Sequence, residues 1–132
     1  LIYKGMMFSD VPNLVFSMGY TNASWTLKAD LTSEYVCRLL NHMRRRGYTE
    51  CRAPRDPGVG EEPLIDFSSG YVQRALDILP KQGSAKPWKL NQNYALDTLA
   101  LRFGALEDGV MRFGRSKASM EPPAAGEATR AA

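Results

Sequence analysis

A short stretch near the start of the chain, GYTNASWTLKA, contains the groups best placed to bind an electron-rich ligand. Asn22, Ser24 and Thr26 are each competent helix N-caps, and Thr26 is favoured because an apolar stripe starts at Leu27. The first backbone N–H groups of that helix, from Leu27 to Ala29, are then unpaired and carry the positive end of the helix dipole. From this pattern alone an ordinary capped helix is the commoner outcome, because every strand–helix unit has such an end.

No other set of residues predicts an independent catalytic centre. The sequence has no GxSxG, HExxH or P-loop motif, and its acidic and hydroxyl residues show no spacing that singles out an acid–base pair. Cys37 and Cys51 lack CxxC spacing and are predicted to be reduced thiols in a cytoplasmic protein. Because His42 is the only histidine, these residues predict no metal site.

Composition excludes further classes of protein. The chain has 17 Lys and Arg residues against 14 Asp and Glu, a mild excess that gives no nucleic-acid footprint. No apolar run approaches the roughly 20 residues that a membrane-spanning helix needs. With 132 residues, of which 44% are hydrophobic, the chain is long enough for one domain with its own core.

Two predicted elements position the candidate stretch. Leu14, Val15 and Phe16 predict a short buried strand, and Gly19 follows where polar residues begin. The period then changes to that of a long helix, which Gly47 ends. Its apolar stripe consists of Leu27, Leu31, Tyr35, Leu39 and Met43, widened by Val36 and Leu40. Ligands of open α/β sheets bind beyond the carboxyl ends of strands, so the stretch between these two elements is the expected site.

The remaining segments predict supporting structure. Residues 1–11 are expected to be irregular, and 63–67 to be a short extended segment. Helices are predicted over 71–79 and 91–103, the second ending at Gly104. The KQGSAKPW turn is expected to have solvated lysines with Trp88 in the core, and a short strand is expected within 110–113.

Charged residues on the long helix have ordinary explanations. Glu34 and Arg38 stand four residues apart in the favourable order and are predicted to pair on an exposed face. Arg44, Arg45 and Arg46 complement the helix dipole at its C-terminal end, so they need no bound phosphate.

A resemblance to a known family lies in the string GYTNASWTLKADLTSEYVCRLLNHM, which is similar to the C-terminal signature of class B flavin-dependent monooxygenases. The similarity is greatest to the Baeyer–Villiger monooxygenases of the ethionamide-activating EthA type. It continues through EEPLIDFSSGYVQRALDILPKQGSAKPWKLNQNYALDTLALRFGALEDGVMRF, to about Phe113. The GxGxxG motifs that this family uses for FAD and NADPH are absent from the sequence, so the resemblance implies the C-terminal part of a larger enzyme.

The implied fold class is α/β, as a C-terminal fragment of a flavoprotein with two Rossmann-like dinucleotide-binding domains. The fragment is expected to contain one strand–helix unit followed by a mostly helical cap. Residues 1–50 would be the C-terminal strand–helix unit of the FAD-binding domain, 51–114 a cap with two shorter helices, and 115–132 a disordered tail, which is polar and rich in small residues.

The resemblance also implies site residues. Gly19 and Tyr20 are expected to bring the backbone close to FAD. Lys28 and Ala29 are expected to direct backbone N–H groups at the flavin pyrimidine ring, with the Lys28 side chain pointing to solvent or to NADP. The first-turn residues in contact with the cofactor are Thr26, Leu27, Lys28 and Ala29, and the substrate side is lined by Asn22, Ala23, Ser24 and Trp25, with Trp25 as an apolar wall.

The full enzyme would use FAD, NADPH and O₂ to oxygenate a small ketone, or a sulfur or nitrogen centre. This chain is expected to contain no catalytic residue, to be inactive alone, and to need the N-terminal part of the same enzyme as its partner. In that hypothesis the N-terminal tip of the long helix lies against FAD, which other parts of the polypeptide hold in place. A tip that is open to solvent, or covered by this chain's own side chains, would count against it.

The alternative is a non-enzymatic α/β module that docks a partner protein. Exposed apolar surface is expected to distinguish the two. A fragment of a flavoprotein should leave the stripe Leu27, Leu31, Tyr35 and Leu39 poorly covered, whereas an independent module should bury it.

Overall fold

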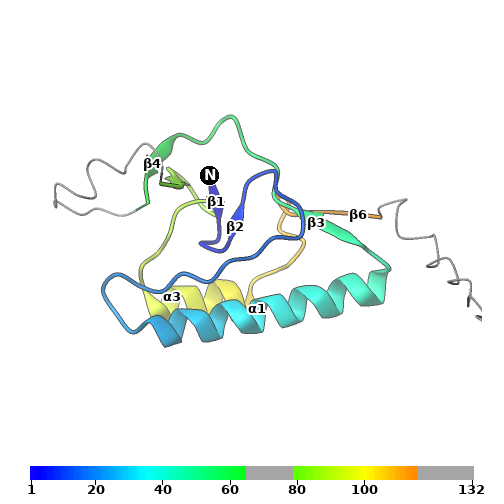
Figure 1. Ribbon diagram of the computed structural model, residues 1–132, viewed down its shortest axis with the longest axis horizontal. Helices are drawn as coiled ribbons and strands as arrows, with labels where there is room; N and C mark the ends of the chain where they lie inside the picture. Colours follow the sequence, from blue (N-terminus) through cyan, green and yellow to red (C-terminus); the bar gives the residue numbers. More distant parts are fainter. Residues whose placement is uncertain (65–78, 116–132) are drawn as a thin grey trace, which may run out of the picture.

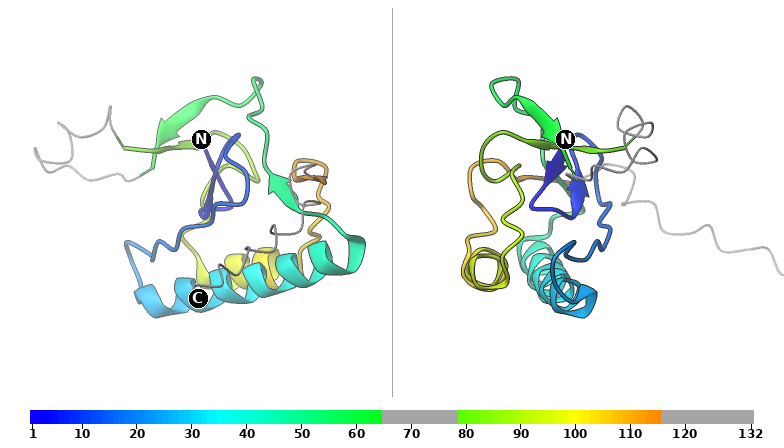
Figure 2. Two further views of the ribbon diagram at one scale, coloured as in Figure 1. Left: turned by 45° about the vertical axis from the view of Figure 1, so that its right-hand side comes forward. Right: turned by 90° about the vertical axis from the view of Figure 1, so that its left-hand side faces the viewer.

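The structure is a computed structural model of the 132-residue chain and describes residues 1–64 and 79–115. One layer contains the long helix α1 (Trp25–Arg46) and the short helix α3 (Tyr94–Thr98), which continues as the π-helical turn η1 (Leu99–Phe103). Short strands lie above this layer (Figure 1). The end-on view shows α3 beside α1, and both α3 and η1 contact that helix (Figure 2).

The strands form three antiparallel pairs. They are β1 (Ile2–Tyr3) with β2 (Met7–Phe8), β3 (Glu50–Arg52) with β6 (Arg112–Gly114), and β4 (Glu61–Pro63) with β5 (Lys81–Gly83). Tyr3 faces Met7 in the first pair, and Cys51 faces Phe113 in the second. Within residues 1–64 and 79–115 no strands pair in parallel, so the described part of the chain is a mixed helix and ribbon structure without a Rossmann unit.

The predicted strand at Leu14–Phe16 is wrong. This segment is extended but unpaired in the described residues: Leu14 is 44% exposed, and the Phe16 N–H donates to the carbonyl of Met6 at 2.8 Å. The Phe16 ring stacks on Phe8 at 4.7 Å instead of entering a sheet. Strands form instead at the segment 1–11, predicted to be irregular, and at 81–83, predicted to be a turn, because both find partners by antiparallel pairing.

Helix α1 confirms the predicted long helix, with a different start. Its N-cap is Ser24, one of the three candidates, so the preference for Thr26 is wrong by two residues. Leu27 is 37% exposed and does not begin the stripe. Lys28 takes the inner position instead, and Leu40 is also exposed. The buried face consists of Lys28, Leu31, Thr32, Tyr35, Leu39 and Met43.

The C-terminal end of α1 is closed by a complete Schellman motif. Gly47 adopts the left-handed conformation, with φ of 68°, as glycine does at little cost. Its N–H donates to the carbonyl of Arg44 at 3.3 Å, and the Tyr48 N–H donates to Met43 at 2.9 Å. The Arg115 side chain also donates to the carbonyls of Arg46 and Gly47. The sequence prediction for this end is confirmed.

The predicted helix over 91–103 is present from Tyr94, with Asn93 as its N-cap. Gly104 ends it in an extended conformation rather than a left-handed cap. Arg38 donates to the carbonyls of Leu101 and Gly104 at 2.6 and 2.7 Å, so it satisfies the end of the π-helical turn.

The predicted pair between Glu34 and Arg38 is therefore wrong. Because Arg38 is used at the end of η1, Glu34 accepts two hydrogen bonds from Arg102, each 2.6 Å long. The result is a bidentate bridge between α1 and η1.

The core lies between the helix layer and the ribbons. Trp88 is 1% exposed, as predicted, and its ring meets Tyr3 edge to face at 5.7 Å. The predicted strand near the C-terminal end is confirmed as β6. The core cluster consists of Tyr3, Met6, Met7, Leu31, Tyr35, Leu39, Met43, Cys51, Ala53, Trp88, Leu101 and Met111.

The prediction that a flavoprotein fragment would leave the apolar stripe of the long helix poorly covered is wrong. Leu31, Tyr35 and Leu39 are 0–2% exposed, because the β1–β2 hairpin and Leu101 cover them from within the chain. On the second helix and its π-helical turn the large exposed hydrophobic side chains are Tyr94, Leu96, Leu99 and Phe103. Three predicted segments lie mostly or wholly outside the described residues: the helix over 71–79, the extended segment 63–67 and the tail beyond Arg115.

Candidate functional site

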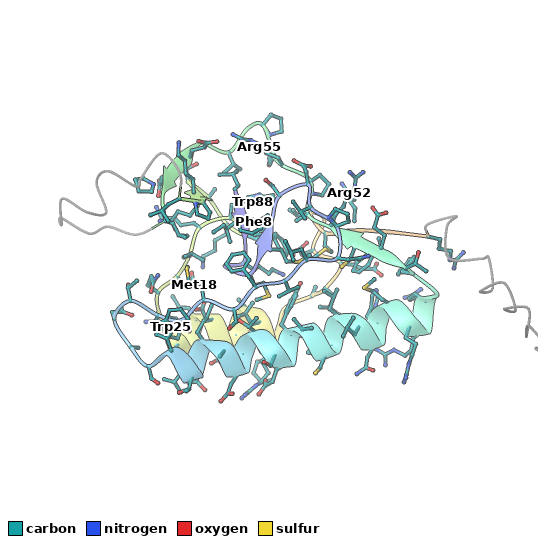
Figure 3. All side chains as sticks on the ribbon, viewed as in Figure 1. Phe8, Met18, Trp25, Arg52, Arg55 and Trp88 are labelled. Atoms are coloured by element: carbon teal, nitrogen blue, oxygen red, sulfur yellow. The ribbon has the colours of Figure 1, made fainter. Side chains whose placement is uncertain are left out.

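The loop before α1 crosses the N-terminal end of the helix, where Trp25 contacts Gly19. A side-chain carbon at Gly19 would lie 2.2 Å from the Trp25 ring, so only glycine allows this approach. The Trp25 side chain lies at the end of α1 next to the segment that carries Met18 (Figure 3). Trp25 is nevertheless 61% exposed. The structure thus brings Gly19 and Trp25, two of the predicted site residues, into direct contact.

Asp97 on α3 gathers two other predicted site residues. Its Oδ2 atom lies 2.8 Å from the Lys28 ammonium and accepts a 2.8 Å hydrogen bond from the Tyr20 hydroxyl. Its Oδ1 atom accepts from the Asn91 amide at 3.0 Å. Tyr20, Lys28 and Asp97 are 4–5% exposed, so the ion pair is buried.

This arrangement corrects the expected direction of Lys28. Its side chain does not point to solvent but forms an ion pair with Asp97, because a buried ammonium needs an opposite charge. Its backbone N–H lies four residues after the Ser24 N-cap and bonds within the helix, so the unpaired N–H groups are those of Trp25 to Leu27 and not the predicted Leu27 to Ala29. Burial, and next the hydrogen bond to Asp97, raise the pKa of Tyr20 well above its ordinary value, so the hydroxyl stays protonated and donates at neutral pH.

Asp97 is the residue that sequence reasoning missed. It stands four residues before Leu101, so both lie on one face of the second helix, and Leu101 is buried. A carboxylate on a buried helix face requires a cationic or hydrogen-bonding partner. That requirement was the available signal, but the sequence alone does not say which of its lysines is the partner.

A second set of contacts joins the same two segments. The Gln92 side-chain carbonyl accepts from the backbone and the hydroxyl of Thr21, both at 3.4 Å. The Asn22 amide donates to the backbone carbonyl of Gln92 at 3.1 Å. The loop that carries the predicted site residues is therefore held by residues 91–97, far from it in the sequence.

The remaining predicted site residues surround an open helix tip. Thr26, Leu27 and the expected substrate-side residues Asn22, Ala23, Ser24 and Trp25 are all exposed, and Ala29 is partly buried. Ser24 and Thr26 bond each other through their hydroxyls at 2.8 Å, and the Ser24 side chain makes no capping hydrogen bond. Nothing among the described side chains covers the tip, so in the described part of the chain it is open to solvent. This is one of the two outcomes expected to count against the flavin hypothesis, and the position of FAD at this tip is therefore only a proposal.

Other site types find no support in the part of the chain that the structure describes. No group of three or more potential metal ligands occurs there. Cys37 and Cys51 are both free thiols. A search of the described helices finds none whose length and hydropathy suit a membrane span.

Comparison with known proteins identifies relatives along most of the chain. It is 53% identical over 120 residues to the FAD-containing monooxygenase EthA of Mycobacterium tuberculosis, a match that covers 89% of this chain and 24% of EthA. EthA of Mycolicibacterium smegmatis is 46% identical over 122 residues, with 91% of this chain and 25% of the relative covered. The Acinetobacter protein described as "Probable FAD-binding monooxygenase AlmA" is 45% identical over 127 residues, with 92% and 26% covered.

These matches do not favour the interaction-module alternative. No family model and no solved structure matches the chain. The chain spans about a quarter of the length of the curated relatives it matches, at their C-terminal end. Identity at this level along some nine-tenths of the sequence confirms the resemblance found in its motifs, and the chain belongs to the EthA-type family of FAD-containing monooxygenases.

Proposed function

We propose that the chain is the C-terminal part of an FAD- and NADPH-dependent monooxygenase that oxygenates ketones, in a Baeyer–Villiger reaction, or sulfur and nitrogen centres. Bound FAD would supply the oxygen chemistry, and the protein would supply binding, orientation and exclusion of water. The observation that carries the proposal is the 53% identity to EthA, extending over the loop and helix start that form the open tip.

The residues at the tip fit an electron-rich ring such as that of FAD. The first turn of α1 contains no acidic residue, and no side chain caps it. Because Ser24 is the N-cap, the N–H groups of Lys28 and Ala29 bond within the helix, to the carbonyls of Ser24 and Trp25. The unpaired N–H groups of the first turn are those of Trp25, Thr26 and Leu27. The unpaired N–H groups of Trp25, Thr26 and Leu27 would stabilise negative charge on the pyrimidine side of the ring. Lys28 and Ala29 would contribute through the positive end of the helix dipole.

The neighbouring loop would divide into a cofactor side and a substrate side. Gly19 and Tyr20 would lie near FAD through their backbone, since the space beside the Gly19 α-carbon is filled by the Trp25 ring. Asn22, Ala23 and Ser24 would line the substrate side together with Trp25, whose exposed ring offers an apolar wall. O₂ and a small organic molecule would be the co-substrates, and the N-terminal part of the same enzyme would hold most of the FAD and NADPH.

A flavin absorbance spectrum tests the proposal. We expect the purified 132-residue chain to be colourless and the full-length protein that contains it to be yellow. The full-length protein should also consume NADPH faster when a ketone or a thioether is added. A colourless full-length protein that binds no added FAD would overturn the proposal and restore the interaction module.

A further inference from the structure

The loop and first turn of α1, residues 19–29, are the only part of the described chain to which the proposed function assigns contact with FAD. Their position is decided by Asp97. This carboxylate bonds Tyr20 at the start of the loop and Lys28 at its end, across separations of 77 and 69 residues. A single side chain thus ties both ends of the stretch to α3.

The packing between this carboxylate and the loop leaves little free space. A cavity of only about 10 Å³ remains between the segments, lined by Gly19, Tyr20, Lys28, Asp97 and their neighbours. It is at the lower limit for one water molecule. On its other side Asp97 lines a cavity of about 100 Å³ together with Asn91 and Leu101, so only a displacement toward the loop would move Tyr20 and Lys28.

Stability alone does not explain a buried charge pair here. Removing two charges from water costs several kcal/mol per ion, and well-packed apolar side chains of similar volume are often as stable. The pair also fixes the positions of two side chains relative to each other, because the Lys28 ammonium and the Tyr20 hydroxyl both bond the same Asp97 oxygen atom at 2.8 Å. Lys28 also follows directly after Trp25, Thr26 and Leu27, whose unpaired N–H groups are assigned to the flavin.

We propose that Asp97 is a positioning residue, which acts through Lys28 and Tyr20 to set where the start of α1 lies against FAD. It touches neither FAD nor substrate itself. This inference rests on the proposed function, because it needs the tip of α1 to face the flavin.

The test compares Asp97→Asn with Asp108→Asn in the full-length, FAD-loaded protein. Asp108 is a matched control, since it also binds a lysine and a tyrosine, Lys4 and Tyr3, but lies outside the loop. The measurements are the dissociation constant for FAD after removal of the bound flavin, the visible circular dichroism of the bound flavin, and the melting temperature.

We expect Asp97→Asn to weaken FAD binding at least 10-fold and to change the flavin circular dichroism. Asp108→Asn should lower the melting temperature and leave both flavin properties unchanged. If Asp97→Asn does not fold, the double variant Lys28→Met with Asp97→Asn decides, because it leaves no uncompensated buried charge. That variant should fold and keep the altered flavin signal.

Two results overturn the inference while leaving the proposed function intact. One is a folded Asp97→Asn or double variant with the FAD affinity and flavin spectrum of the parent. The other is an Asp108→Asn variant that changes the spectrum as much as Asp97→Asn does. A parent protein that binds no FAD overturns both proposals, so the two failures are distinguishable.

Discussion

Asp97 and Asp108 each accept a lysine ammonium and a tyrosine hydroxyl on the same Oδ2 atom. The partners of Asp97 are Lys28 and Tyr20, and those of Asp108 are Lys4 and Tyr3. The two networks differ in burial: the lysine and aspartate side chains are each 6% exposed around Asp97, but 10% and 20% exposed around Asp108.

The networks also differ in how far their support depends on distant residues. Asp108 accepts on its other oxygen from the backbone N–H groups of Val110 and Met111, two and three residues further on. Its own turn therefore holds it in place. The partner of the Asp97 side chain that is nearest in the sequence is Asn91, six residues away. The other two partners, Tyr20 and Lys28, are 77 and 69 residues away. The same chemistry thus stabilises a turn in one place and positions a candidate cofactor site in the other.

The largest expected effect separates the networks by removing each lysine. Lys28→Met should lower the free energy of unfolding of the chain by about 3–5 kcal/mol, because it leaves the Asp97 carboxylate buried without a cation. Lys4→Met should cost only about 1 kcal/mol, since Asp108 is partly solvated and keeps its two backbone donors. Urea unfolding of the two variants measures the difference. Equal losses would contradict the distinction drawn between the networks.

A smaller effect tests what the loop held by Asp97 does. In the full-length enzyme, Trp25→Ala should change the ratio of kcat/KM between a bulky and a small substrate by about 10-fold, as one apolar contact can. FAD retention should change little. Phe103→Ala is the control, because that side chain is also large and exposed but lies on η1. Loss of FAD with an unchanged substrate preference would show that Trp25 belongs to the cofactor side.

The smallest effect concerns acid stability at Asp108. Partial burial alone would raise the pKa of this carboxyl, but the Tyr3 hydroxyl, the Met111 N–H and the Lys4 ammonium together hold it below its usual range. Because the unfolded chain then binds the proton more readily, this stabilisation is complete only well above the unfolded pKa of about 4 and is lost as the pH falls through the lower folded value.

Asp108→Asn should therefore lose stability relative to the parent at neutral pH, with a difference that shrinks between about pH 5 and pH 2. Unfolding curves in urea across this range measure it. A difference that stayed constant with pH would show that the ionised form of Asp108 contributes nothing.

Elements built from local signals were predictable. The long helix, its end at Gly47, the second helix and the strand β6 follow from periodicity and capping residues. The strand at Leu14–Phe16 failed because a short apolar run does not say whether a partner strand exists. Leu27 was predicted to face inward and Lys28 outward, and both predictions were wrong. The apolar periodicity alone does not show that the ion pair with Asp97 turns Lys28 inward.

By itself the sequence determined the family, the long helix and the stretch in which a cofactor site should be sought, since each follows from a pattern of residues that are close together in the sequence. Only the tertiary structure decided that Asp97 is the partner of Lys28 and Tyr20, and that residues 91–97 hold the loop. The physical reason is that the cost of burying a charge depends on which groups surround it, and those groups come from segments about 70 residues apart.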